Sequence, residues 1–358
     1  MLRHMLVLTA FTLGGLQGFA HAASFPGGSE GGAPLNLEQG HPGQEPGASA
    51  DIGNTSIQAL TAGSGGVIYA GSCGMGIFRS ADRGGSWTSA NQGLTDPFVL
   101  CLTTGKDGAI YAGTFRGGVF RSRDGGKIWQ PVNKGLKRLE IKALMMDAKG
   151  LYAGTGDGVY LLNAAQDQWK VVSTGLDEIL VHALARTDDG TLYAGTSGKG
   201  VHSYKERSTG WTRLRQGLRD HEGLVENFIR VLAVDKEQGV YAGTFDGGVF
   251  RSGDAGKTWS PISRALPNDS IRGLISNERG VYVATGRGIF KTVDKGRQWV
   301  PLNKGLSNLS VQVLIEGEKG GFYAGTSSGV FRSDDDGLTW TAVSQGLEGE
   351  SVAPFKFN

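Results

Sequence analysis

Five aspartates recur in one local sequence, Ser/Thr-x-Asp-x-Gly-x-x-Trp. Repeated carboxylates of this kind can act as acid–base groups or as calcium ligands. They are Asp82, Asp124, Asp254, Asp294 and Asp335. Two related segments lack the aspartate, with Gln166 and Glu206 nearby, yet keep their tryptophans, Trp169 and Trp211. Since the tryptophan persists where the carboxylate does not, the pattern favours structural turns in which Ser and Asp oxygens accept backbone N–H groups. We expect no metal and no cofactor.

Positive charges recur at a second equivalent position, near the start of each related segment. The residues at this position are Gln58, Leu100, Lys142, His182, Arg230, Arg272 and Gln312. Three fixed cations with a histidine could hold an acidic peptide, a carboxylate terminus or another anion. The alternative is that these side chains reach water or pair with Glu140, Asp177 and Glu178 in neighbouring loops.

Aromatic and charged residues occupy the segments expected to join the second and third strands of each unit. They include Phe115, Arg116, Phe245, Asp246 and Arg287. Exposed aromatic rings beside arginine suit a protein-binding hot spot, whereas rings folded back over the sheet would only pack. Together with the cations, these residues form the predicted partner-binding site.

The two cysteines, Cys73 and Cys101, are expected near one face of adjacent units. In an oxidising compartment they could form a disulfide, and two free thiols are the alternative. Other chemical motifs are missing from the sequence, which has no His-Glu-x-x-His, no Cys-x-x-Cys and no glycine-rich turn that opens a helix. No catalytic residues are therefore predicted.

These residues belong to a sequence unit that is repeated along the chain, and the fold of that unit must position them. Near-copies of Tyr-Ala-Gly-Thr begin at Tyr69, Tyr111, Tyr152, Tyr193, Tyr241, Tyr282 and Tyr323. Each unit of about 41 residues contains four short runs suited to strands, and none suited to a helix. Four strands per unit indicate a propeller blade, and seven blades close a ring without exposed sheet edges. We therefore predict an all-β, seven-bladed propeller rather than an open solenoid, which would need polar capping repeats.

The recurring box, for example Ser80-x-Asp82-x-Gly84-x-x-Trp87, resembles the Asp-box (BNR) repeat family and spans essentially the whole ring. Blades reading Gly-Val-Phe-Arg-Ser-x-Asp are also similar to photosystem II assembly and stability factors. That resemblance implies an exported, non-enzymatic scaffold that binds a membrane-associated protein partner. The Asp-box family also includes sialidases and xyloglucan-type glycosidases, so a lectin-like or divergent glycosidase function is the alternative. The arginine signature Phe-Arg-Ile-Pro of those enzymes is absent here.

Composition and the N-terminal sequence define the remaining expectations. Thirty-six basic and 34 acidic residues leave a net charge of +2, too small for a general nucleic-acid binder. Residues 1–22 read as a secretory signal and residues 23–50 as a disordered Gly/Pro-rich neck. Residues 51–358 form the predicted propeller, with a short extra strand at 351–358. We expect a periplasmic or secreted protein, monomeric, with no membrane span after signal cleavage.

Overall fold

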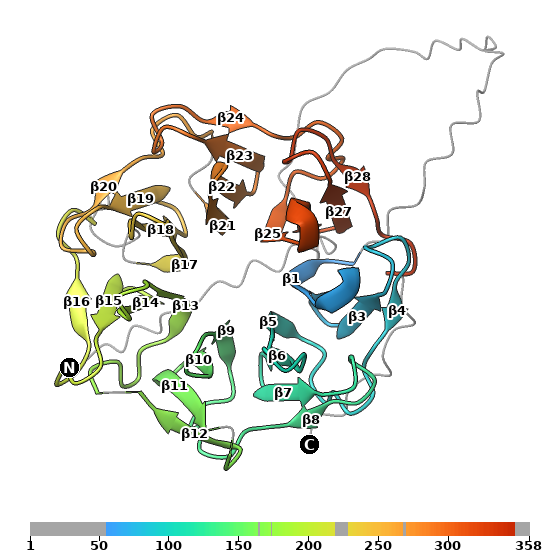
Figure 1. Ribbon diagram of the computed structural model, residues 1–358, viewed down its shortest axis with the longest axis horizontal. Helices are drawn as coiled ribbons and strands as arrows, with labels where there is room; N and C mark the ends of the chain where they lie inside the picture. The colour runs from blue at the N-terminus through green and yellow to red at the C-terminus, as the bar shows by residue number, and fades with distance from the viewer. Residues whose placement is uncertain (1–54, 164, 173, 219–227, 268–269, 348–358) are drawn as a thin grey trace, which may run out of the picture. The chain divides into compact units, whose positions relative to one another are not determined.

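The computed structural model describes residues 55–347, apart from 164, 173, 219–227 and 268–269. Within them the strands form seven four-stranded antiparallel sheets, each made of consecutive strands in sequence order. Figure 1 shows the sheets as blades arranged in a ring, with the first strand of each blade innermost. The predicted all-β, seven-bladed propeller is confirmed. The signal, the neck and the proposed strand at 351–358 lie outside the described residues.

The strands of the seven blades have the following bounds. Blades 1 to 4 comprise β1 (Ile57–Ala62), β2 (Ile68–Ser72), β3 (Ile77–Ser80), β4 (Thr88–Ser89), β5 (Val99–Thr104), β6 (Ile110–Thr114), β7 (Val119–Ser122), β8 (Gln130–Pro131), β9 (Ile141–Met146), β10 (Leu151–Thr155), β11 (Gly158–Asn163), β12 (Gln168–Val171), β13 (Val181–Arg186), β14 (Leu192–Thr196), β15 (Val201–Tyr204) and β16 (Thr212–Leu214). Blades 5 to 7 comprise β17 (Ile229–Val234), β18 (Val240–Thr244), β19 (Val249–Ser252), β20 (Ser260–Pro261), β21 (Ile271–Asn277), β22 (Gly280–Thr285), β23 (Gly288–Thr292), β24 (Val300–Pro301), β25 (Val311–Glu316), β26 (Phe322–Thr326), β27 (Gly329–Ser333) and β28 (Thr341–Ala342). Two short 3-10 helices are η1 (Ser64–Gly66) and η2 (Glu318–Gly320).

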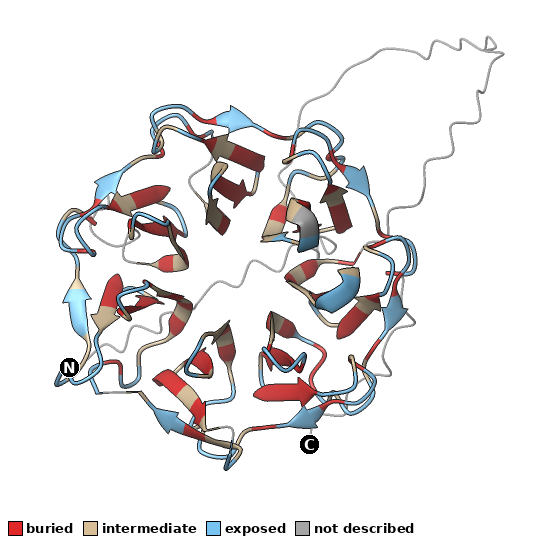
Figure 2. Ribbon diagram, in the orientation of Figure 1, coloured by how far each residue is buried: buried red, intermediate tan, exposed pale blue. Residues whose placement is uncertain are grey.

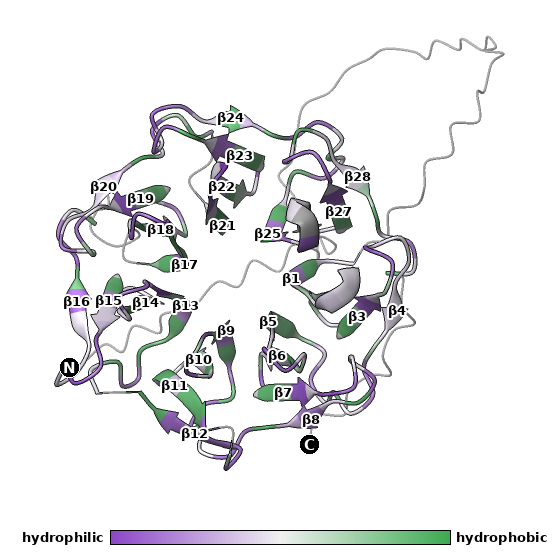
Figure 3. Ribbon diagram, viewed as in Figure 1, coloured by the Kyte–Doolittle hydropathy of each residue, from purple (hydrophilic) through white to green (hydrophobic). Residues whose placement is uncertain are grey.

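Burial follows the order of the strands from the channel to the rim. The second strands, such as β2 and β6, are buried at every position except Gly280 at the start of β22, because a neighbouring blade covers each face. The outermost strands, such as β4 and β8, are exposed. Figure 2 shows this gradient, and Figure 3 shows hydrophilic residues gathered in the peripheral turns. The core therefore lies between blades rather than in one central mass.

Neighbouring blades approach closely because the second strand carries a glycine. A Cβ on Gly71 would lie 2.5 Å from Cγ1 of Val99 on the next blade. Blade 6 has Ala284 at this position, and there the inner strand has Gly273 in place of a larger residue. A Cβ on Gly273 would lie 3.2 Å from that of Ala284, its partner in the same blade, and 3.2 Å from the Leu314 backbone nitrogen of blade 7. Bulk lost from one strand is thus replaced on the other, which indicates that inter-blade spacing limits both positions.

The tryptophans join each blade to the one before it. The Trp129 indole donates to the Ala90 carbonyl at 2.8 Å, and this pattern is repeated for five of the seven indoles. At the junction of blades 7 and 1, the Trp87 indole donates to the Val343 carbonyl at 2.7 Å. The Thr55 hydroxyl also donates to the Leu347 carbonyl at 2.7 Å. Packing and hydrogen bonds therefore close the ring within the described residues.

The Asp-box turns lie between the third and fourth strands, at the outer edge of the ring (Figure 1). In the first box, the Gly84 amide donates to the Ser80 hydroxyl at 2.7 Å, which in turn donates to Asp82 at 2.7 Å. The Asp82 carboxylate also accepts the Ser86 amide at 2.9 Å. Arg83 and Gly84 both adopt positive φ, 62° and 93°. These carboxylates are occupied by their own turns, as the structural interpretation requires.

Candidate functional site

A β-bulge in the first strand of every blade positions the recurrent cations. The pairing of first and second strands skips one residue in each blade, as between Ile229 and Val231 in blade 5. The skipped residues are Gln58, Leu100, Lys142, His182, Arg230, Arg272 and Gln312, which we call the mouth residues. Bulges re-aim side chains that regular pairing would hold in the sheet. All seven mouth residues are half-buried, at the end of the innermost strands.

Arg230 and Arg272 are the mouth cations that lack a carboxylate partner among the described residues. The Arg272 Nη1 donates to Ser310 Oγ at 2.9 Å, while its buried Nε has no hydrogen-bond partner there. Burial, together with a smaller contribution from the nearby charge of Arg272, lowers the pKa of Arg230 to about 10. Burial also lowers the pKa of Arg272. Two adjacent blades thus hold guanidinium groups that an incoming anion would stabilise.

The sequence predicted a basic ring at the mouth, but Lys142 is paired with a carboxylate and His182 is neutral. Lys142 pairs with Glu140 at 2.8 Å, which is the neighbouring-loop pairing considered above. Burial lowers the pKa of His182 to about 3, with smaller contributions from the charges of Lys142 and Arg230. The imidazole is therefore neutral near pH 7, and its ring lies 4.5 Å from that of Phe228. The positive charge of the mouth lies mainly on blades 5 and 6.

The turn between β6 and β7 carries the predicted pair Phe115 and Arg116. The Arg116 guanidinium lies 5.2 Å from the centre of the Phe115 ring, and Lys142 Nζ lies 5.6 Å from the same ring. Asp96 fixes the turn by accepting the backbone amides of Arg116 and Gly117 at 2.5 and 2.8 Å. The structure therefore brings Phe115 beside the mouth, where the ring is half-buried rather than fully displayed.

The turn between β18 and β19 brings a second aromatic group to the mouth. Phe245 is 41% exposed, and its ring lies 5.5 Å from Phe228 and 5.9 Å from the Arg230 guanidinium. Asp246 beside it is exposed. Arg287, in the corresponding turn of blade 6, is exposed and donates to the Pro267 carbonyl at 3.4 Å. Phe245 and Arg230 are thus in contact, whereas Arg287 lies in a separate turn.

Sequence reasoning missed several apolar residues of the same face. Phe98, Leu139 and Leu309 are exposed by 39%, 40% and 42%. They lie one or two residues before the first strands of their blades. Phe98 and Leu139 also lie beside the turns between second and third strands: Cys73 bridges to Phe98, and Gly118 donates to the Leu139 carbonyl at 3.1 Å. A comparison of side-chain size at the equivalent positions of the seven repeats could have identified these residues from the sequence. We call this surface, formed by the mouth residues and the adjoining turns and inter-blade segments, the mouth face.

Cys73 and Cys101 are both free thiols in the structure. Cys73 is exposed in its turn beside Phe98. The Cys101 Sγ instead lies 3.6 Å from the Ile141 carbonyl on blade 3, and burial raises the pKa of this thiol to about 12. The disulfide considered from the sequence is therefore not formed here, because the Cys101 sulfur is directed toward the next blade rather than back toward blade 1.

The described residues, 55–347 apart from 164, 173, 219–227 and 268–269, contain no cluster of metal ligands and no membrane-spanning helix. No group of three or more His, Cys, Asp or Glu side chains there could hold a metal ion. None of the helices in that part has the length and hydrophobicity needed to cross a bilayer.

Comparisons with known proteins agree with this architecture. Residues 77–90, which contain the first box, match the BNR-Asp box repeat family. The fold is similar to an extracellular domain of a hybrid two component system from B. thetaiotaomicron, with 20% identity and a TM-score of 0.67 over 79% of this chain and 39% of that one. It is also similar to the GH74 enzyme of Niastella koreensis, with 14% identity and a TM-score of 0.64 over 83% of this chain and 55% of that one.

A third similar structure is close in length to the ring. YCF48 from Cyanidioschyzon merolae has 14% identity and a TM-score of 0.59, over 78% of this chain and 95% of that one. YCF48 has also been solved bound to D1 peptide, with 12% identity and a TM-score of 0.60 over 78% of this chain and 94% of that one. The chain spans less than two thirds of the first two proteins, and these identities show a shared fold. No curated protein has significant sequence similarity to the chain. The chain is therefore a seven-bladed β-propeller in which residues 77–90 match the BNR-Asp box repeat family, with a fold similar to that of YCF48.

Proposed function

We propose that this protein is an exported, non-enzymatic propeller that binds a protein partner on its mouth face, as a scaffold or assembly factor. The observation that carries the proposal is the pair Arg230 and Arg272. Both guanidinium groups are half-buried on adjacent blades, and neither forms an ion pair within the described residues. Partly buried charge without a counter-charge is unfavourable, so a carboxylate supplied by a partner would stabilise it.

The surroundings of these arginines indicate the kind of partner. Phe245 is exposed next to Arg230, and Phe98, Leu139 and Leu309 add exposed apolar surface on other blades of the same face. Apolar groups around a desolvated charged centre are typical of protein-binding hot spots. A polypeptide segment that combines acidic and apolar side chains would therefore fit the mouth face better than a purely polar ligand.

Two comparisons support this proposal. YCF48, which has the same fold, is found bound to a D1 peptide, so a propeller of this size can present a peptide-binding surface. The similar domain from B. thetaiotaomicron is extracellular, and residues 1–22 are predicted from the sequence to be a secretory signal, which together favour a periplasmic or secreted location. We propose that the mature protein acts as a monomer.

Photo-crosslinking from the mouth face tests the proposal. The variant Phe245→benzoylphenylalanine, irradiated in the protein's native compartment, should crosslink one protein partner. The variant Leu338→benzoylphenylalanine, on the rim, should not crosslink it. The double variant R230E/R272E should reduce that crosslink at least tenfold, because each charge-assisted hydrogen bond contributes about 1.5–3 kcal/mol. R230K/R272K should retain part of it. The matched control K127E/R297E reverses two exposed rim charges and should leave the crosslink unchanged.

Other outcomes of these experiments would contradict the proposal. Identical crosslinks from positions 245 and 338, or equal losses in R230E/R272E and K127E/R297E, would show that the mouth face has no specific partner. Release of sugar from a glycan panel by the purified protein would instead establish the carbohydrate-active alternative.

A further inference from the structure

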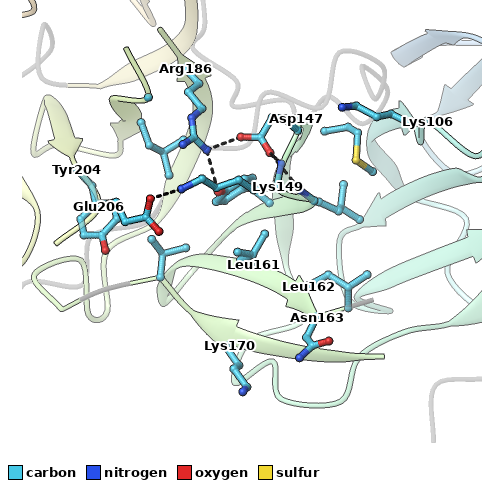
Figure 4. Close-up of a pocket in the computed structure, with 18 of the residues that line it drawn as sticks. Lys106, Asp147, Lys149, Leu161, Leu162, Asn163, Lys170, Arg186, Tyr204 and Glu206 are labelled. Carbon is cyan, nitrogen blue, oxygen red and sulfur yellow. Dashed lines mark hydrogen bonds and ion pairs between the residues drawn. The ribbon is translucent and has the colours of Figure 1, made fainter. Parts of the chain in front are cut away.

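A pocket of about 690 Å³ lies across blades 2, 3 and 4, at the turns that join first and second strands. These turns are at the opposite end of the strands from the mouth residues. Residues 147–150, between β9 and β10, form one side of the pocket. Figure 4 shows the side chains that surround it. The pocket is therefore separate from the mouth face.

In blades that have an Asp-box, the box covers a tyrosine of the preceding blade. The Tyr193 hydroxyl of blade 4 donates to the carbonyl of Ala255, in the box of blade 5, at 3.3 Å. Across the ring junction, the Tyr323 hydroxyl donates to the Arg83 carbonyl at 3.3 Å. These tyrosines are the first residues of the Tyr-Ala-Gly-Thr repeats, so the contact belongs to the repeat itself.

Blades 3 and 4 are the two that lack the box, and the pocket is found where their boxes would lie. The tyrosines of the blades preceding them, Tyr111 and Tyr152, both line it. The corresponding space beside Tyr241, which the box of blade 6 adjoins, measures only about 250 Å³. The enlarged pocket therefore follows from the local loss of two Asp-boxes.

The pocket combines apolar walls with hydrogen-bond donors. Leu161, Val171 and Val172 contribute apolar surface from the β11–β12 hairpin. Arg186 Nη1 donates to Asp147 at 2.5 Å and to the Tyr152 hydroxyl at 3.0 Å. Among the residues described, no partner accepts from Arg186 Nε or Nη2, so donors of a positioned guanidinium remain available.

The remaining charges also favour an anion. Lys149 pairs with Glu206, whereas the exposed Lys106 and Lys170, on two sides of the pocket in Figure 4, form no ion pair within the described residues. The lining has four cationic side chains against three carboxylates. Small-molecule pockets of about 300–1,000 Å³ typically have this composition, apolar walls with a few fixed polar groups.

We infer that this pocket binds a small amphipathic acid, a carboxylate or sulfonate on an aliphatic or aromatic body. The body would lie on Leu161 and Val172, which share the face of the hairpin that packs toward blade 4, and the acid group would accept from the free donors of Arg186. This second site is independent of the proposed partner-binding function. The pocket forms because blades 3 and 4 lack the Asp-box, and it does not involve the mouth residues.

The test uses 1-anilinonaphthalene-8-sulfonate, an aromatic sulfonate whose fluorescence rises on binding, with the mature folded protein. One saturable site should appear, and octanoate should displace the probe while octylammonium, with the same alkyl body, should not. K170E reverses an exposed lining charge on the same face of the hairpin as Leu161, and it should weaken binding at least tenfold. The control L338E changes a rim residue that is 63% exposed and should have no effect.

Three results would overturn this inference: no saturable binding by wild type, equal displacement by octylammonium, or wild-type affinity in K170E. R230E/R272E separates the two proposals, because mouth variants should leave the probe affinity unchanged. Loss of probe binding in R230E/R272E would place the acid at the mouth and refute the pocket. Failure of the partner crosslink with intact probe binding would refute only the proposed function.

Discussion

The seven equivalent tryptophans allow a stability prediction with an internal control. The Trp129 indole N–H donates to the Ala90 carbonyl at 2.8 Å, in a buried setting. The Trp259 indole is equally buried, but its Nε1 has no partner among the described residues. Backbone pairing at the two sites matches, because both main-chain amides donate to the preceding blade at 2.8 and 2.9 Å. W129F and W259F therefore differ mainly in one hydrogen bond.

The expected free energies of unfolding follow from that difference. Replacing indole by phenyl removes similar apolar surface at both sites and costs on the order of 1–2 kcal/mol in each. W129F also leaves the Ala90 carbonyl without its donor, which costs about 1–3 kcal/mol more. W259F removes a buried donor that was already unsatisfied, so part of its loss is offset. We expect W129F to be less stable than W259F by about 2 kcal/mol or more.

Equilibrium urea unfolding at 25 °C, followed by far-UV circular dichroism, measures this difference. Tryptophan fluorescence is unsuitable, because each variant removes a fluorophore. The slopes with urea must agree between variants for the midpoints to report free energies. An equal loss in the two variants, or a greater loss in W259F, would refute the assignment of inter-blade stability to the indole hydrogen bonds.

Three further predictions concern blade spacing and pH. G195A should destabilise the ring by about 1–3 kcal/mol, since its Cβ would lie 2.6 Å from Ile229, whereas G253A, which meets only a flexible arginine, should be nearly neutral in the same urea assay. Hydrogen bonds, first from a threonine hydroxyl four residues on, lower the pKa of Asp335 to about 2. This carboxylate therefore contributes stability above pH ~4 that is lost as the pH falls through about 2. D335N should show a smaller drop in urea midpoint between these pH values, and an unchanged drop would contradict the prediction. Burial lowers the pKa of His182 to about 3, so on acidification the unfolded chain binds a proton at this residue before the folded chain does. The stability of the fold should therefore fall from pH ~6.5 toward 3. H182F should flatten that decline, and a steeper decline would show that the imidazole is not buried in its neutral form.

The regular part of the fold could be predicted because its determinants are local. Each Asp-box is held by hydrogen bonds between residues no more than four apart, such as Ser80 to Gly84, so the sequence pattern specifies the turn directly. The alternating strand runs and the recurrent tryptophans likewise indicate four strands per unit, and seven units imply a closed ring. The equivalent positions of Lys142, Arg230 and Arg272 could be recognised from the repeat alone.

The properties of the candidate site depend on contacts that no local pattern specifies. The repeat identified the mouth residues but not the bulge that re-aims them, nor that Lys142 is paired while Arg230 is not. The neutrality of His182 arises from burial and from charges on neighbouring blades, residues about 40 or more positions away in sequence. The ring junction joins Trp87 to Val343, and the pocket requires side chains from three blades. Burial and hydrogen-bond satisfaction depend on how whole blades pack against one another, so only the tertiary structure decided which repeated side chains remain available to a ligand.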